Sequence, residues 1–286
     1  MVLEQLYPLR LIEENPTYAL LLGLCYSVIG IGASVILFPE DPAIVAVAFI
    51  AIMIYPTLNK LLKQEEEIES KKEEFHPIRF LMEHRYVIYV YGLFFLGSLL
   101  AFSLFALILP NLATNHIFEN QIQVLYRSRT GNAIFSFGLL RDLISNNMGV
   151  FVLCFLAAFV FGDGGIFLII WNASVWGTIF GNIAKTAAES TAQNPFFIFL
   201  IVIGVVSPHM ILEAFSYVCS GSAGGIISKG LLKESFMNQR FRQITKNTTI
   251  FLIFAFIILL IAAVIETYVL GNVRVYQNIV RQSFLR

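Results

Sequence analysis

The sequence predicts an all-α, polytopic membrane protein, a bundle of about seven transmembrane helices. Of its 286 residues, 57% are hydrophobic and only 13% are charged, and the mean hydropathy is +0.76. Soluble proteins average roughly 45–50% apolar and about 25% charged residues. Long apolar stretches also recur along the whole chain. The formal net charge of zero gives no sign of the basic surface that nucleic-acid-binding proteins carry.

Each predicted span is an apolar segment of roughly the length that crosses a bilayer, which takes about 20 helical residues. The sequence PEDP at 39–42 leaves room only for a tight turn between the first two spans, and glycines at 162–165 favour another between the fourth and fifth. The spans lie near residues 18–38, 42–59, 87–110, 148–162, 165–184, 195–228 and 249–271.

The sixth apolar segment is too long for one simple helix. Pro208 lies inside it, and a proline has no amide donor and clashes with the preceding helical turn. We therefore expect a broken sixth helix, with 195–206 as a half-helix or re-entrant piece and 208–228 as the main span.

The ends and connections complete the predicted domain organisation. The first residues carry Glu4, Glu13 and Glu14 and no cleavage site, so we do not expect them to form a signal peptide. We expect 1–59 to form an amphipathic segment plus a two-helix hairpin, 60–86 a charged cytoplasmic loop, 87–275 a five-helix membrane core and 276–286 a C-terminal tail.

Two connections need an interpretation. The charge-dense loop 60–86 is typical of a solvated helix that extends the second span, with a docking site for a partner as the alternative. The stretch 111–147 has apolar residues at helical spacing near its end, which predicts an interfacial helix or a re-entrant half-helix before the fourth span.

Lysine and arginine in short loops predict the orientation, because they accumulate on the cytoplasmic side. Both basic loops, 60–86 and 229–247, face the cytoplasm if four spans separate them. The prediction is a plasma-membrane protein with a cytoplasmic N-terminus and an external C-terminus. The arginines of the C-terminal tail oppose this orientation: Arg274, Arg281 and Arg286.

His209 and Glu213 are the most informative residues of the chain. They follow Pro208 inside an apolar segment and lie one helical turn apart on the same face. Each ionisable group in the bilayer centre costs on the order of 2.5–3.5 kcal/mol, so a partner, a water-filled cavity or a ligand must offset the cost.

Other polar residues occur in the last four spans. Asn146 and Asn147 open the fourth span, Asn172 lies near the middle of the fifth, and Glu266 lies in the outer part of the seventh. We expect these residues to converge with His209 and Glu213 on one intramembrane site that binds a ligand or ion. The alternatives are hydrogen bonds between packed helices and, for Glu266, a side chain that reaches out to the interface.

Catalytic motifs give weaker signals. His209 and Glu213 could supply two metal ligands, with Glu266 as a third. The zinc-protease pattern His-Glu-x-x-His is absent, however, and so are nucleophile-elbow, phosphate-binding-loop and paired-aspartate motifs. The three cysteines lie apart in apolar stretches and form no metal or disulfide pattern. We predict no cofactor.

The short polar motifs of these spans, in this order, make the sequence resemble the stage II sporulation protein M family of polytopic membrane proteins. The resemblance covers about residues 85–275 and rests on four short stretches: Asn146-Asn147, Asn172 with its following glycines, Pro208-His209 with Glu213, and Ala262-Ala263 to Glu266-Thr267. The family has a small residue where this chain has Met210. The founding members of this family recruit or scaffold cell-wall-degrading proteins at the membrane, and the activity of other relatives is unsettled. The resemblance therefore implies a membrane protein with a recruiting or scaffolding role.

The leading functional hypothesis is a scaffold or transport-like membrane protein with a polar intramembrane site. An intramembrane metal-dependent hydrolase using His209 and Glu213 is one alternative, and a purely structural interaction protein is another. The predicted partners are the lipid bilayer, other membrane or cell-envelope proteins and a second copy of the chain, but not nucleic acid.

Overall fold

The computed structural model describes residues 9–69, 77–127, 137–162, 165–233 and 238–284, and every element in these ranges is a helix. Seven helices are long and apolar enough to cross a membrane, which confirms the predicted class and number of spans. They are α3 (Tyr18–Leu37), α4 (Pro42–Glu69), α5 (Pro77–Ile108), α8 (Phe137–Phe161), α9 (Gly165–Thr191), α10 (Pro195–Lys233) and α11 (Gln239–Asn272). The shorter helices are α2 (Leu9–Glu14), α6 (Asn111–Ile117), α7 (Glu119–Arg127) and α12 (Arg274–Ser283).

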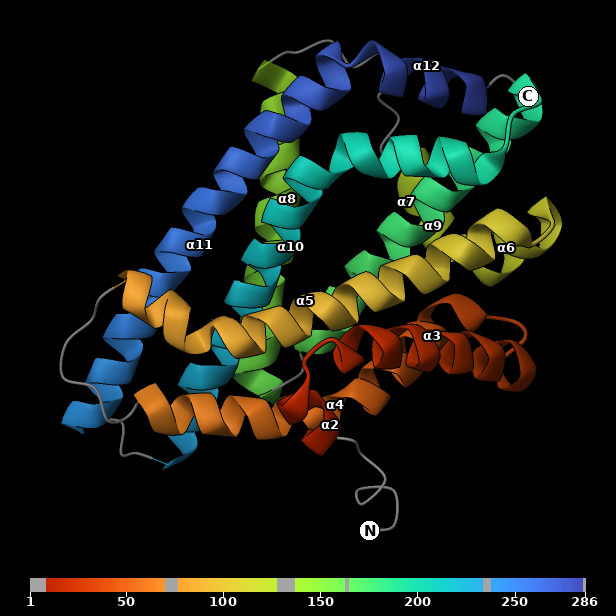
Figure 1. Cartoon of the computed structure of the whole chain (residues 1–286). Coiled ribbons are helices and arrows are strands. Elements are labelled where there is room, and N and C mark those ends of the chain that lie inside the picture. Colours follow the sequence, from red (N-terminus) through yellow and green to blue (C-terminus); the bar gives the residue numbers. More distant parts are fainter. Residues whose placement is uncertain (1–8, 70–76, 128–136, 163–164, 234–237, 285–286) are drawn as a thin grey trace.

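Helix α9 is the centre of the bundle. It packs against α5 and α4 on one side and against α10 and α8 on the other (Figure 1). Two glycines make the α5 contact close: a Cβ at Gly177 would lie 2.5 Å from the Leu99 carbonyl oxygen, and one at Gly181 would lie 2.7 Å from that of Ser103. The two helices therefore meet nearly backbone to backbone, which is how membrane helices gain packing contacts.

Helices α8, α10 and α11 form a second group that packs mutually. Ser220 of α10 donates a hydrogen bond to the Phe151 carbonyl of α8 at 2.6 Å. The backbones of α10 and α8 also approach closely at Gly224, where a Cβ would collide with the Phe155 carbonyl of α8.

The sixth span is bent but not broken, which corrects the predicted separate half-helix. Helix α10 runs without interruption from Pro195 to Lys233 with Pro208 inside it. Figure 1 shows that its first part runs in a different direction from the rest of the helix. Pro208 removes one amide donor, and the hydroxyl of Ser207 donates instead to the freed Gly204 carbonyl at 3.1 Å. Only one backbone bond had to be replaced, so the helix bends and continues.

The connections between the spans are largely helical, and the one before the fourth span differs from the expectation. Residues 137–147 are the first turns of α8 and not a separate interfacial or re-entrant helix, because their apolar pattern continues directly into the span. Asn146 and Asn147 thus lie inside α8 and do not open it. The loop 60–86 consists largely of the ends of α4 and α5, with 70–76 outside the described residues. Residues 111–127 form α6 and α7.

The predicted C-terminal tail is largely a helix. Helix α12 lies along one end of the bundle and packs against α9 (Figure 1). Tyr276 and Ile279 are buried in this contact, and Gln277 donates to the Leu270 carbonyl of α11 at 2.9 Å. These contacts close the end of the bundle nearest to Glu266.

Candidate functional site

Three helices bring two carboxyl groups and one amide together. Glu213 comes from α10, Glu266 from α11 and Asn147 from α8. The Asn147 Nδ2 atom lies 3.5 Å from Glu266 Oε2 as a hydrogen-bond donor. The carboxyl groups of Glu213 and Glu266 lie within interaction range of each other and of Asn147. We call Asn147, Glu213 and Glu266 the carboxyl cluster.

The carboxyl cluster is enclosed by the packing of its helices. Glu213 is 3% exposed and Asn147 is 5% exposed, whereas Glu266 is partly exposed. Oxygen Oε1 of Glu213 is buried and has no hydrogen-bond partner among the described residues. A buried carboxyl oxygen without a donor costs free energy unless a proton, a cation or water satisfies it.

Asn146 supports the orientation of the Asn147 amide. The exposed Asn146 side chain donates through Nδ2 to Asn147 Oδ1 at 3.2 Å. The Asn147 oxygen is thus occupied, and its NH₂ group faces Glu266. Of the two neighbouring asparagines, only Asn147 reaches the carboxyl groups directly.

His209 lies on α10 one turn before Glu213 and is 6% exposed. Its Nδ1 atom is buried and has no partner within the described part of the chain. In that part, no three His, Cys, Asp or Glu side chains lie close enough together to hold a metal ion. The hydrolase alternative, with His209, Glu213 and Glu266 as ligands, therefore finds no support in the geometry.

Asn172 stays within its own helix. Its Nδ2 atom donates to the Leu168 carbonyl of α9 at 2.8 Å. This is the common arrangement of a polar side chain that returns to a carbonyl one turn earlier. None of the contacts described for Asn172 reaches the carboxyl cluster, with which the sequence analysis grouped it.

Two tyrosines near the carboxyl cluster escaped the sequence analysis. Tyr217, 2% exposed, follows Glu213 by one turn and lies within electrostatic range of Glu213 and Glu266. Its ring centroid is 6.5 Å from that of Trp176 on α9. Tyr276 of α12 lies near Glu266. The spacing 209, 213, 217 places three polar side chains on one helical face, and this pattern could have revealed Tyr217.

The chain matches a protein-family model over a range that includes these residues. Residues 35–269 match the family model described as stage II sporulation protein M. The match starts further towards the N-terminus than the resemblance at residue 85 and includes all of α4. It also contains the whole carboxyl cluster.

Comparisons with curated proteins and with solved structures found no match. The family match covers well over half of the chain, from the end of α3 to the last turn of α11. On this ground, the chain is a member of the stage II sporulation protein M family, an integral membrane protein family.

Proposed function

We propose that this protein is a transport-like membrane component in which Glu213 and Glu266 together hold a proton or a small cation. The observation that carries the proposal is the proximity of the two carboxyl groups inside a bundle of apolar helices. Two carboxylates side by side repel each other, and one shared proton or bound cation removes the repulsion. Ionisable groups inside membrane spans commonly mark ion or proton pathways.

The surrounding residues have matching roles in this proposal. Asn147 donates to Glu266 and holds it in place when the carboxylate is charged. His209 and Tyr217, one turn on either side of Glu213, are candidates for passing a proton along the face of α10. The bend at Pro208 gives α10 a position where the two halves of the helix can move relative to each other.

Ion flux into liposomes tests the proposal. The purified chain is reconstituted, and proton, sodium and potassium fluxes are followed with ion-sensitive dyes. We expect flux above that of empty liposomes, and we expect Glu213→Gln to abolish it because an amide cannot exchange a proton or balance a cation. Glu119→Gln, at an exposed position of α7, is the matched control and should retain full flux. Equal flux in Glu213→Gln and the unmodified chain would contradict the proposal.

A scaffold role is the second candidate, and membership in the family favours it. A scaffold acts through its surfaces, so its partners should stay bound when the carboxyl pair is neutralised. Co-purification from membranes of the double variant Glu213→Gln with Glu266→Gln distinguishes the two. An unchanged set of bound proteins together with absent flux in every variant supports the scaffold.

We also propose the orientation in which both basic connections face the cytoplasm, the N-terminus is cytoplasmic and the C-terminus is outside the plasma membrane. The ends of α4 and α10 lie towards the same side of the view in Figure 1, opposite the turn between α3 and α4. Labelling of intact cells with a membrane-impermeant thiol reagent tests this. Val275→Cys should react from outside and Leu232→Cys should not; both positions are exposed, at 53% and 85%.

A further inference from the structure

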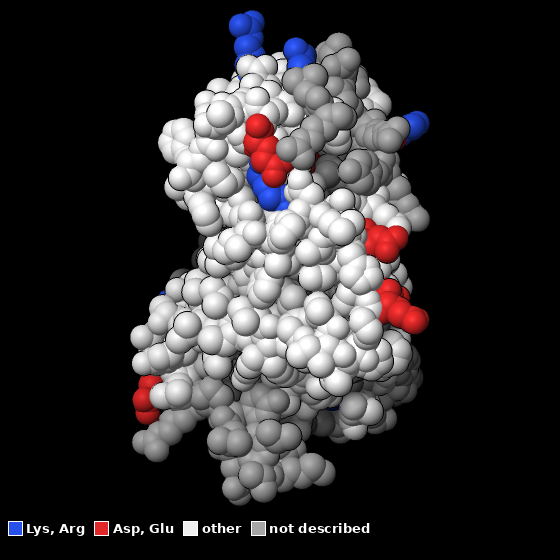
Figure 2. All heavy atoms as spheres, turned by 90° about the vertical axis from the view of Figure 1, so that its right-hand side faces the viewer, with Lys and Arg blue, Asp and Glu red and all other residues white. Residues whose placement is uncertain are grey.

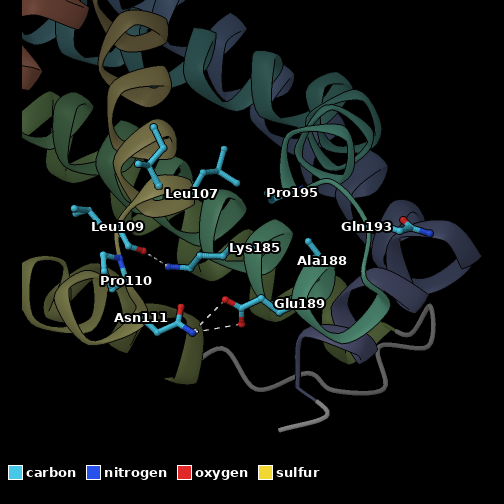
Figure 3. A pocket seen from close by; sticks show the side chains of 10 residues that line it. Leu107, Leu109, Pro110, Asn111, Lys185, Ala188, Glu189, Gln193 and Pro195 are labelled. Carbon is cyan, nitrogen blue, oxygen red and sulfur yellow. Dashed lines mark hydrogen bonds between the residues drawn. The ribbon is translucent and has the colours of Figure 1, made fainter.

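A cavity of about 360 Å³ lies apart from the carboxyl cluster, where the end of α5 meets the end of α9. Its volume falls within the range of small-molecule sites, roughly 300–1,000 Å³. Figure 3 shows Lys185 and Glu189 reaching from α9 towards the chain segment that follows α5. The cavity is lined by Leu107, Ile108, Leu109, Pro110, Asn111, Lys185, Ala188, Glu189, Gln193 and Pro195.

Lys185 places a buried positive charge at this cavity. Its side chain is 6% exposed, and its Nζ atom donates to the Leu109 carbonyl and to the Thr114 hydroxyl, each at 3.0 Å. Both acceptors are neutral. Among the described residues, the ion pair within 4.0 Å joins Arg141 and Asp142. No carboxylate in the described ranges therefore forms an ion pair with Lys185 at this distance. A buried cation of this kind favours an anionic group as its neighbour.

A negative group lies one helical turn further along α9. The exposed Glu189 accepts from Asn111 Nδ2, at 3.4 and 3.5 Å from its two oxygens. The buried Asn111 Oδ1 atom has no partner among the described residues. The polar lining of the cavity thus offers the Lys185 cation and, about one 5.4 Å turn away, the exposed Glu189 carboxylate.

The remaining wall is apolar and lies at the level where the spans end. Helix α5 ends at Ile108, and α10 begins at Pro195. Ile108 is 68% exposed, and Phe197 in the first turn of α10 is 59% exposed. Figure 2, which faces this side of the molecule, shows a mostly uncharged surface with a hollow where acidic and basic side chains lie together. Apolar surface beside a small charged site is the environment of a lipid at the membrane boundary.

We propose that the cavity binds the headgroup of a phospholipid that carries a primary amine, such as phosphatidylethanolamine. The phosphate lies against the Lys185 ammonium group, and the lipid ammonium group donates to the exposed Glu189 carboxylate. The two carbons between phosphate and amine match the one-turn separation of Lys185 and Glu189. The acyl chains continue along the exposed side chains of Ile108 and Phe197.

Native mass spectrometry of the full chain with added lipids tests the proposal. The probes are phosphatidylethanolamine, phosphatidylcholine, phosphatidylglycerol and the soluble headgroup glycerophosphoethanolamine. We expect phosphatidylethanolamine to bind most tightly. Lys185→Met should weaken its binding by about fivefold or more, since one basic residue near a phosphate contributes about 1 kcal/mol. Lys185→Arg should retain binding.

Two controls separate lipid binding from the structural role of Lys185, which also caps the end of α5 by donating to the Leu109 carbonyl. Glu189→Gln leaves that cap intact and should remove the preference for phosphatidylethanolamine over phosphatidylglycerol. Lys229→Met removes another buried lysine that donates to a backbone carbonyl, that of Asn59, and should bind lipid like the unmodified chain. Unchanged binding in Lys185→Met would overturn the proposal. If the soluble headgroup bound as tightly as phosphatidylethanolamine, the ligand would be a free phosphoester and not a lipid, which would overturn the proposal.

Discussion

A single amide orients the carboxyl groups of the cluster. Asn147 is the described hydrogen-bond donor to Glu266 in the carboxyl cluster, at 3.5 Å, and Asn146 occupies its oxygen so that the NH₂ group faces the carboxylates. The cluster is therefore oriented by a side chain that carries no charge.

Replacement of Asn147 tests this role. Asn147→Ala removes the donor while both carboxyl groups stay among the packed helices, and a buried polar or charged group that loses its hydrogen bond costs about 1–3 kcal/mol. We expect a loss of that size in the free energy of unfolding, measured by titrating the detergent-solubilised protein with a denaturing detergent.

The neighbouring residue is the matched control. Asn146→Ala deletes an exposed amide and leaves the bond from Asn147 to Glu266 in place, so its cost should stay within about 0.5 kcal/mol. Equal losses in the two variants would mean that Asn147 does not hold the carboxyl groups.

Sequence reasoning identified most of the carboxyl cluster because ionisable and amide side chains are rare in apolar spans. Glu213, Glu266 and Asn147 were all predicted to converge, and they do. Asn172 is also an asparagine in an apolar span, but its side chain donates to a carbonyl of its own helix. Lys185 was counted as part of a loop because the predicted span ended one residue earlier, whereas α9 continues to Thr191.

At the scale of helices, Pro208 illustrates where a local rule stops. The rule that proline interrupts a helix correctly located the bend in α10. It could not reveal that Ser207 would donate to the Gly204 carbonyl, because this bond depends on the rotamer that the folded helix allows. Helix α12 escaped prediction for a related reason: a helix of this length is marginal alone, and packing on α9 stabilises it.

Tyr276 provides a pH test of the docking of α12. Burial, and secondly the negative charge of Glu266, raise the pKa of the Tyr276 phenol to about 12. A raised pKa means that the neutral phenol stabilises the folded state. This contribution is complete below the ordinary tyrosine pKa of about 10 and is lost as the pH rises towards about 12.

We therefore expect α12 to become accessible to protease as the pH rises through this window. Tyr276→Phe cannot ionise and should keep α12 docked at the same pH values. The difference in tyrosinate absorbance between the two proteins reports the titration of Tyr276 itself. A tyrosine in this position that titrates at its ordinary pKa would contradict the burial of α12 against the bundle.

At the scale of the whole molecule, α5 joins the N-terminal helices to the rest of the bundle. Gly177 of α9 approaches it from one side. On the other side, a Cβ at Gly97 would collide with the Leu20 carbonyl of α3, and one at Gly23 would lie 2.8 Å from the Phe94 carbonyl. The family resemblance seen in the sequence begins only near residue 85, yet these contacts make α3 part of the same packed structure.

Two glycines on α5 allow a matched test of this close contact. In Gly97→Ala the new methyl group meets the backbone of α3, which cannot move aside as a side chain can, so overpacking should cost about 1–3 kcal/mol. Gly92→Ala adds the same methyl group where no atom lies within 4 Å, so it should be neutral or stabilise by up to about 1 kcal/mol through helix propensity. Unfolding in detergent measures both. If Gly97→Ala were as stable as Gly92→Ala, α3 would not be in backbone contact with α5, and the first span would be a separate addition that leaves the stability of the remaining bundle unchanged.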